Sequence, residues 1–128
     1  MPDELNYLAI PYSHPNPVVR EQRFHLANQI AGLLMQKGLH VFSPISHTHP
    51  IAVDVALPTG WDYWQRFDRI MLKMCSRLLV ATVQGWQESK GVEAEVNMAM
   101  ELNIPVVFVK PIVGINGVEG LNISPEIF

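Results

Sequence analysis

Residues 77–83, Arg-Leu-Leu-Val-Ala-Thr-Val, form an apolar run with β-branched residues, and this run limits the folds open to the chain. It is typical of a β-strand that is covered on both faces. Helical patterns flank it, at about residues 60–75 and 89–103. A buried strand between two helices indicates a parallel sheet, because parallel strands need a crossover connection that is usually helical.

Strand and helix patterns alternate along the rest of the chain. Apolar runs predict further strands at residues 5–10, 39–43 and 104–109. Between the first two, Asn16 as N-cap and Pro17 at the first position open a long helix, which Lys37-Gly38 ends. The order β-α-β-α-β-α-β predicts one α/β domain over residues 1–128, with a mainly parallel sheet and helices on both faces.

Two segments lack a clear pattern. Residues 44–59 contain three prolines and two histidines and are predicted to form a loop, with a short irregular helix around 51–55 as an alternative. After Lys110 the glycines are spaced like loop residues, and the last residues are expected to form a short edge strand or a tail. The glycines of this region precede no helix, so they are not a dinucleotide-binding fingerprint.

Composition excludes several classes of function. A net charge of −3 with 9 Lys and Arg argues against a nucleic-acid polymer or an anionic membrane as partner. The single cysteine, Cys75, cannot form an internal disulfide and is expected to be an inert core residue. No apolar signal core and no run of about 20 apolar residues is present. We therefore expect a cytoplasmic domain.

Two carboxylates occupy positions where helical spacing predicts buried residues. Glu95 shares a stripe with the apolar residues Val92, Val96, Ala99 and Leu102. Asp68 shares a second stripe, on the preceding helix, with Trp61, Trp64, Met71 and Cys75. Burial of an ionised acid costs several kcal/mol or raises its pKa. Two inward acids on neighbouring helices are what glycosidic chemistry needs, with one as nucleophile and one as proton donor.

A structural interpretation of both acids stands beside this one. Asp68 has Arg66 and Arg69 as close neighbours in sequence, and an inward Asp often binds an Arg or a backbone amide. Glu95, like Glu93, lies near a helix N-terminus, where the helix dipole favours acids. An ion-pair network in a purely structural domain therefore remains an alternative.

The carboxyl ends of the predicted strands should gather further residues at one rim, where ligands bind in parallel α/β folds. The segment Tyr12-Ser13-His14 precedes a helix N-terminus, which suits an anion. Ser46, Ser89 and Gly91 are expected at the same rim. Trp86 is expected either to stack on a ligand or to cover the sheet edge. His47 and His49 resemble a pair of metal ligands, but no third ligand is near in sequence, so no metal site is predicted.

An ordered set of short motifs resembles the nucleoside 2-deoxyribosyltransferase superfamily and, within it, a bacterial group known as a domain of unknown function. The resemblance covers roughly residues 5–110 and rests on the segments 7–13, 38–44, 89–99 and 103–105 together with Asp68. It implies a flavodoxin-like three-layer sandwich with a doubly wound sheet, without a cofactor. It also implies cleavage or exchange of N-glycosidic bonds in nucleosides or nucleotides.

The resemblance assigns roles by position. Glu95 would be the nucleophile and Asp68 the acid or orienting carboxylate, while Tyr7, Pro11 and Ser13 would line the sugar or phosphate end. Ile10 and Glu93 stand where relatives usually have glycine. Ser76-Arg77 stands where relatives often have an acidic residue before the third strand. These departures leave two further hypotheses: a non-catalytic nucleotide-binding or sensory module, and the structural domain described above.

Self-association is expected as well. Related domains often pair so that a neighbour completes the pocket, and three aromatic residues near the start of one predicted helix would suit such an interface. These residues are Trp61, Tyr63 and Trp64.

Overall fold

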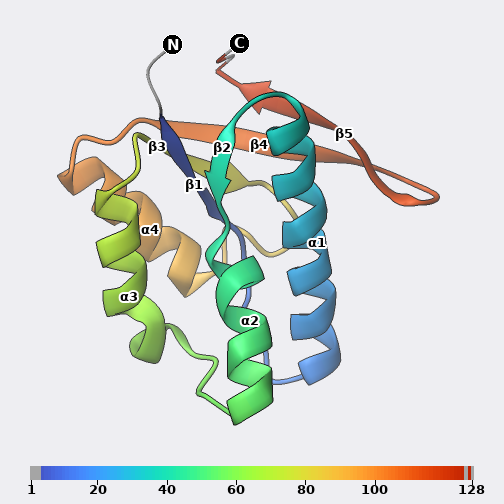
Figure 1. Ribbon diagram of the computed structural model, residues 1–128, viewed down its shortest axis with the longest axis vertical. Coiled ribbons are helices and arrows are strands. Elements are labelled where there is room, and N and C mark those ends of the chain that lie inside the picture. The colour runs from blue at the N-terminus through green and yellow to red at the C-terminus, as the bar shows by residue number, and fades with distance from the viewer. Residues whose placement is uncertain (1–3, 126, 128) are drawn as a thin grey trace.

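Five strands form one sheet in the order β2-β1-β3-β4-β5 (Figure 1). The structure is a computed structural model and describes residues 4–125 and 127. The strands are β1 (Leu5–Ala9), β2 (His40–Phe42), β3 (Arg77–Ala81), β4 (Val106–Gly114) and β5 (Gly117–Ser124). The first four are mutually parallel, and β5 pairs antiparallel with β4.

Four helices connect and flank the sheet. They are α1 (Pro17–Gln36), α2 (Pro44–Val55), α3 (Trp61–Lys73) and α4 (Lys90–Glu101). The Asn16 side chain accepts a hydrogen bond from the amide of Val18 at 2.9 Å, and Ser89 caps α4 in the same way. The predicted N-caps at these two helices are therefore confirmed. The prediction of an α/β chain with a mostly parallel sheet is confirmed too.

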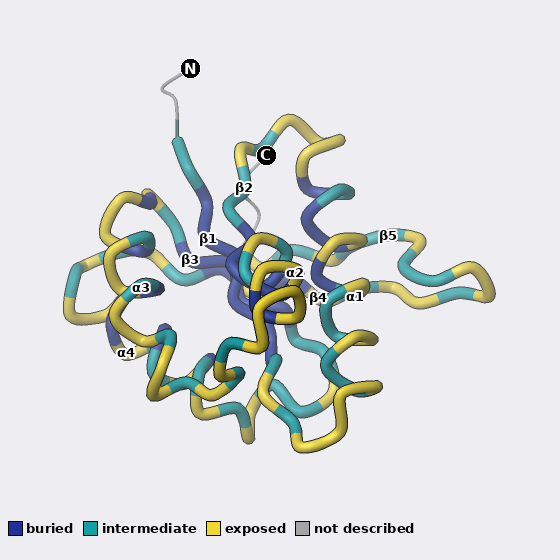
Figure 2. Tube along the Cα trace, turned by 60° about the horizontal axis from the view of Figure 1, so that its bottom comes forward, coloured by how far each residue is buried: buried dark blue, intermediate teal, exposed yellow. Residues whose placement is uncertain are grey.

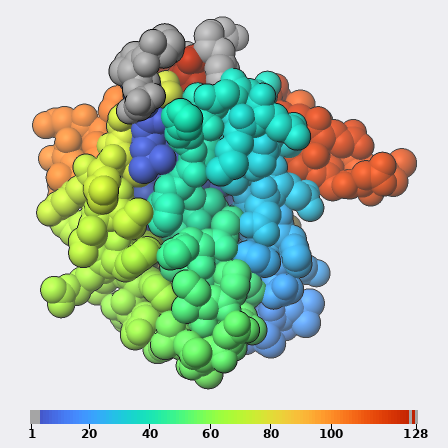
Figure 3. Space-filling model, viewed as in Figure 1, coloured from blue at the N-terminus to red at the C-terminus, as the bar shows by residue number. Residues whose placement is uncertain are grey.

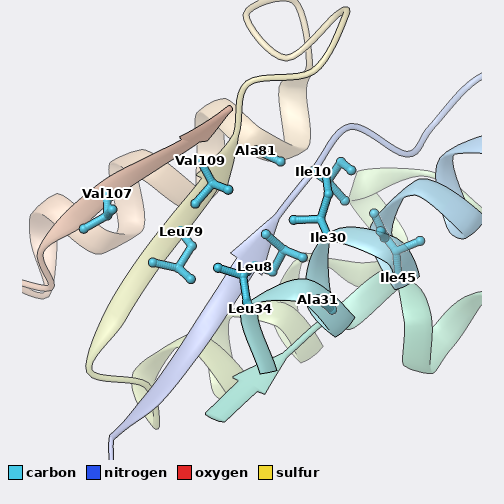
Figure 4. Packing of buried hydrophobic residues seen from close by; sticks show 11 residues of the cluster. Leu8, Ile10, Ile30, Ala31, Leu34, Ile45, Leu79, Ala81, Val107 and Val109 are labelled. Atoms are coloured by element: carbon cyan, nitrogen blue, oxygen red, sulfur yellow. The ribbon is translucent and has the colours of Figure 1, made fainter. Parts of the chain in front are cut away.

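The strands bury side chains on both faces, because successive residues of a strand point to opposite sides. Leu8 on β1 and Leu79 on β3 pack with α1 in one core cluster (Figure 4). Tyr7 and Leu78, their neighbours in sequence, pack with α3 and α4 in a second cluster. In Figure 2 the central strands are dark blue, whereas the helices carry exposed residues on their outer turns. This two-sided burial explains the apolar run that marks β3 in the sequence.

The loop predicted for residues 44–59 is wrong over most of its length. Residues 44–55 form the continuous helix α2, which has Pro44 in its first turn and Pro50 in its interior. The buried side chains of Ile45, His49 and Ala52 recur at helical spacing and face the core. Burial of this face outweighs the cost of Pro50, which removes one backbone hydrogen bond of the helix and whose ring crowds the preceding turn.

The expected loop after Lys110 is also wrong. β4 continues to Gly114 and returns as β5, so that the two strands form a hairpin that projects beyond the rest of the molecule (Figure 3). Leu121 and Ile123 lie on one side of β5, while Asn122 is exposed between them. Among the described residues, no helix is long and apolar enough to cross a bilayer.

Candidate active site

A pocket with a volume of about 730 Å³ lies at the carboxyl ends of β1 and β3. The loop after β1, the loop after β3, and the first turns of α2, α3 and α4 contribute to its wall. Because β1 and β3 are parallel neighbours, their following loops leave the sheet at the same edge. The pocket therefore lies where the sequence predicts a ligand rim.

Glu95 lies on the second turn of α4 and reaches this pocket although its side chain is almost fully buried. The phenol of Tyr7, from the middle of β1, donates a hydrogen bond to Oε2 of Glu95. Burial raises the pKa of Glu95 well above its usual range, and the nearby charge of Asp68 raises it further, whereas the Tyr7 bond lowers it. Glu95 is thus a buried acid held by a neutral donor.

Asp68 reaches the same pocket from α3, with 9% of its surface exposed. Burial raises the pKa of Asp68 to about 7, and a hydrogen bond from Tyr7 opposes that rise. The same burial, together with the two carboxylates, raises the pKa of the Tyr7 phenol well above its usual range. Tyr7 therefore stays a proton donor between the two acids.

The two carboxyl groups repel each other when both are ionised. Since the charge of Asp68 raises the pKa of Glu95, the pair retains a proton at neutral pH. One group can then serve as an anion while the other still carries a proton. This is the combination that a nucleophile and a general acid require.

The structural alternative predicts a basic partner for these acids. In the described part of the chain, the ion pairs engage other acids: Arg69 lies 3.8 Å from Glu101, and Arg77 lies 3.2 Å from Glu4. Arg69, a neighbour of Asp68 in sequence, therefore pairs with another acid. Neither Asp68 nor Glu95 gains a compensating cation within ion-pair distance among the described residues.

The structure brings most of the predicted rim residues together. Residues from the loop after β1 and from the start of α4 line the pocket, namely Pro11, Tyr12, Ser13, His14, Ser89 and Gly91. Tyr7 lies behind them as the partner of Glu95. A Cβ on Gly91 would lie 3.5 Å from the ring of Trp61, so the start of α4 packs closely on α3 at this point.

Two predicted rim residues are not in the wall of the pocket. The hydroxyl of Ser46 pairs with that of Ser43 at 2.7 Å on the first turn of α2. Trp86 packs against Phe108, with ring centroids 5.8 Å apart, and against the core between the sheet and α4. This position corresponds to the expectation that Trp86 covers the sheet.

Other pocket residues had no predicted ligand role. Arg23 projects from α1, donates to the backbone carbonyl of Ser13 at 3.0 Å, and lies beside Gly85 of the loop after β3. Lys90 lines the pocket at the start of α4. In the sequence, Arg23 is one of several polar residues on a helix, so only the tertiary fold reveals its position.

The aromatic residues of α3 have mixed surroundings. Trp61 and Trp64 line the pocket, and the indole of Trp64 donates to the carbonyl of Pro58 at 2.7 Å. Tyr63 is half exposed. His47 is exposed on α2 and stacks on Phe67, whereas His49 is buried. No group of three metal-ligating side chains occurs among the residues that the structure describes.

A comparison with protein families places most of this chain in one of them. The sequence model of a family described as a domain of unknown function, DUF1937, matches residues 4–110. The match runs from β1 to the first half of β4 and includes every residue that lines the pocket. A search of curated proteins finds no match.

Proposed function

Because the chain belongs to the family described as a domain of unknown function, DUF1937, we propose its function from the chemistry of the pocket. The protein cleaves or exchanges the N-glycosidic bond of a nucleoside, nucleotide or related ribosyl compound. The observation that carries this proposal is the pair of buried acids, Glu95 and Asp68, which line one pocket and both interact with Tyr7, whose phenol donates to Glu95. No basic residue compensates them within the described chain.

The resemblance to the nucleoside 2-deoxyribosyltransferase superfamily is part of this proposal, as is the finer fold assignment. The strand order β2-β1-β3-β4-β5 and the core clusters on both faces of the sheet support a flavodoxin-like, doubly wound sandwich. β5 is antiparallel to β4 and follows it through a hairpin, which departs from a strictly doubly wound topology.

The proposed reaction has two steps. A carboxylate oxygen of Glu95 attacks C1′ of the sugar, the bond from C1′ to the base nitrogen breaks, and its electron pair leaves with the base. Asp68 gives its proton to the departing nitrogen. Water, or a second base in a transfer reaction, then attacks C1′ while the ionised Asp68 accepts its proton, and Glu95 is released.

Tyr7 favours the reactive form of the acid pair. A hydrogen bond from its phenol stabilises the anion of Glu95 more than the protonated acid. Burial raises the pKa of both acids, so the pair retains a proton, and the proposed reaction requires this proton to be on Asp68 when Glu95 attacks. Burial strengthens these electrostatic effects, because few water molecules screen the charges.

The test is release of free base from a panel of nucleosides, nucleoside monophosphates and NAD. We expect release by the native protein from one class of compound, and a loss of at least about a thousandfold in Glu95→Gln, which preserves the shape of the side chain. Glu93→Gln, on the exposed face of the same helix, is the matched control and should retain activity. Absence of release from every compound would contradict the proposal.

The same panel separates the alternative functions. A nucleotide-binding or sensory module would show a raised melting temperature with a ligand but no free base. A structural domain would show neither response.

A further inference from the structure

A second group of titratable residues lies next to the pocket and has no part in the proposed reaction. They surround a hollow of about 510 Å³ between the loop after β1, α1 and α2. Its wall includes the titratable residues Tyr12, Arg20, Glu21 and His49, and also Thr59. Tyr12 and Thr59 also line the main pocket, so the two spaces share a wall. The hollow thus adjoins the candidate active site.

Three of these residues form a hydrogen-bonded chain. The phenol oxygen of Tyr12 lies 2.5 Å from Nδ1 of His49, and Nε2 of His49 lies 2.6 Å from Oε2 of Glu21. His49 is 4% exposed, and the ring of Phe24 packs on it with centroids 4.5 Å apart. The imidazole of α2 is therefore held in one place by the loop after β1 and by α1.

The direction of each hydrogen bond follows from the chemistry of its ends. Bonding to His49 lowers the pKa of Glu21, so Glu21 is ionised near neutral pH and can only accept. His49 must then carry its hydrogen on Nε2. In the neutral ring, Nδ1 has a lone pair, and the phenol of Tyr12 donates its only proton to it.

With that proton committed, the oxygen of Tyr12 can only accept hydrogen bonds, and Arg20 is one donor beside it. We propose that Tyr12, oriented by His49 and Glu21, is a specificity residue that accepts a hydrogen bond from an amino or hydroxyl group of the bound ligand. The inference rests on the proposed function for its choice of ligands, nucleosides with an exocyclic amino group or sugar hydroxyls. His49 and Glu21 act as positioning residues.

Two further side chains lie beside this hydrogen-bonded trio. His25 lies 3.3 Å from Glu21, and Arg20 bonds the carbonyl of His14 and also the phenol of Tyr12.

The experiment measures dissociation constants by calorimetry in a Glu95→Gln background, which leaves the ligands intact. Adenosine is compared with purine riboside, which lacks the amino group, and with 2′-deoxyadenosine and 3′-deoxyadenosine. One of these pairs should differ by about fivefold to tenfold at pH 8, which is the effect of one hydrogen bond. Tyr12→Phe, which preserves the ring, should abolish that difference.

Variants of Glu21 separate positioning from simple packing. Glu21→Ala should reduce the preference, whereas Glu21→Gln should retain it, because its amide oxygen still accepts from Nε2 of His49. His25→Gln, which alters the exposed partner of Glu21, is the control and should leave the preference unchanged.

Equal affinity across the panel, or the same preference in Tyr12→Phe, would overturn the inference. If the preference follows Tyr12 but the native protein releases no base, the proposed function fails and this inference stands. If base release depends on Glu95 but the preference among ligands is the same in Tyr12→Phe, this inference fails and the proposed function stands.

Discussion

Tyr7 on β1 donates its phenolic hydrogen to the carboxylate of Glu95 on α4, and this bond links an interior strand of the sheet to the candidate nucleophile. Tyr7 is fully buried, so its position is fixed by the packing of the sheet. An acid on a helix of the outer layer is thus held by a residue that the core itself orients. The proposed chemistry depends on this arrangement.

Removal of the Tyr7 hydroxyl tests that dependence. Tyr7→Phe should lower kcat for base release by about tenfold to a hundredfold, since a hydrogen bond to a charged group contributes about 1.5–3 kcal/mol. Without this donor, the pKa of Glu95 rises further, and the acidic limb of the rate profile should move to higher pH. The measurement is kcat against pH. An unchanged profile would show that the hydroxyl does not tune Glu95.

Asp68 should make the stability of the fold depend on pH. Its pKa is raised to about 7 in the folded protein, against an ordinary value of 3.8, so the folded state binds more protons between these values. Its contribution is therefore fully present below about pH 4 and is lost as the pH rises through about 7. Asp68→Asn should be more stable than the native protein at pH 8, by an order of 2–4 kcal/mol.

The measurement is urea unfolding of both proteins at pH 5 and pH 8. The difference between them should be smaller at pH 5 than at pH 8, because the cost of ionising Asp68 in the fold grows between these values. Asp62→Asn, on the exposed first turn of the same helix, is the control for loss of a carboxylate. An Asn variant that is equally destabilised at both pH values would assign Asp68 a structural hydrogen-bonding role.

The sequence could predict the two acids because each one breaks a helical pattern. Glu95 and Asp68 lie among apolar residues at helical spacing, and the structure buries both. The caps at Asn16 and Ser89 were predictable for a similar reason, since capping needs only nearby residues. Where residues close in sequence decide the conformation, the sequence is sufficient to predict it.

Other features depend on contacts between distant segments. Pro50 suggests a loop, but the spacing of Ile45, His49 and Ala52 shows a buried helical face once His49 is counted as a core residue. The hydrogen bonds from Tyr12 through His49 to Glu21 join three elements, and no spacing in the sequence predicts that these residues meet. Arg23 reaches the pocket only because α1 packs beside the loop after β3.

Arg23 offers a test of whether the substrate carries a phosphate. Its guanidinium lines the pocket, with the carbonyl of Ser13 as its partner, and burial lowers its pKa. Arg23→Gln should raise KM for a nucleoside monophosphate by about tenfold while the KM for the matching nucleoside changes little. An equal effect on both compounds would mean that Arg23 supports the loop and does not bind a phosphate.

Gly85 should be intolerant of a side chain. It adopts φ +86°, and a Cβ there would lie 3.3 Å from the guanidinium of Arg23. Gly85→Ala should destabilise the fold by about 1–2 kcal/mol, since L-residues rarely adopt this conformation. Thermal unfolding measures the change, with Gly60→Ala as the control, because Gly60 has φ −86° and open space around its Cβ position. Equal losses would rule out a conformational requirement at Gly85.

Pro50 should lower the stability of α2. It lies inside the helix and is exposed, so its ring removes a backbone donor without adding buried contacts. Pro50→Ala is expected to stabilise the protein by about 1–3 kcal/mol in urea unfolding. Pro44→Ala is the matched control, because a proline in the first turn costs no helical hydrogen bond and Pro44 is buried at the pocket. That variant should gain nothing, and a Pro50→Ala protein that also gained nothing would show that the helix already accommodates the ring.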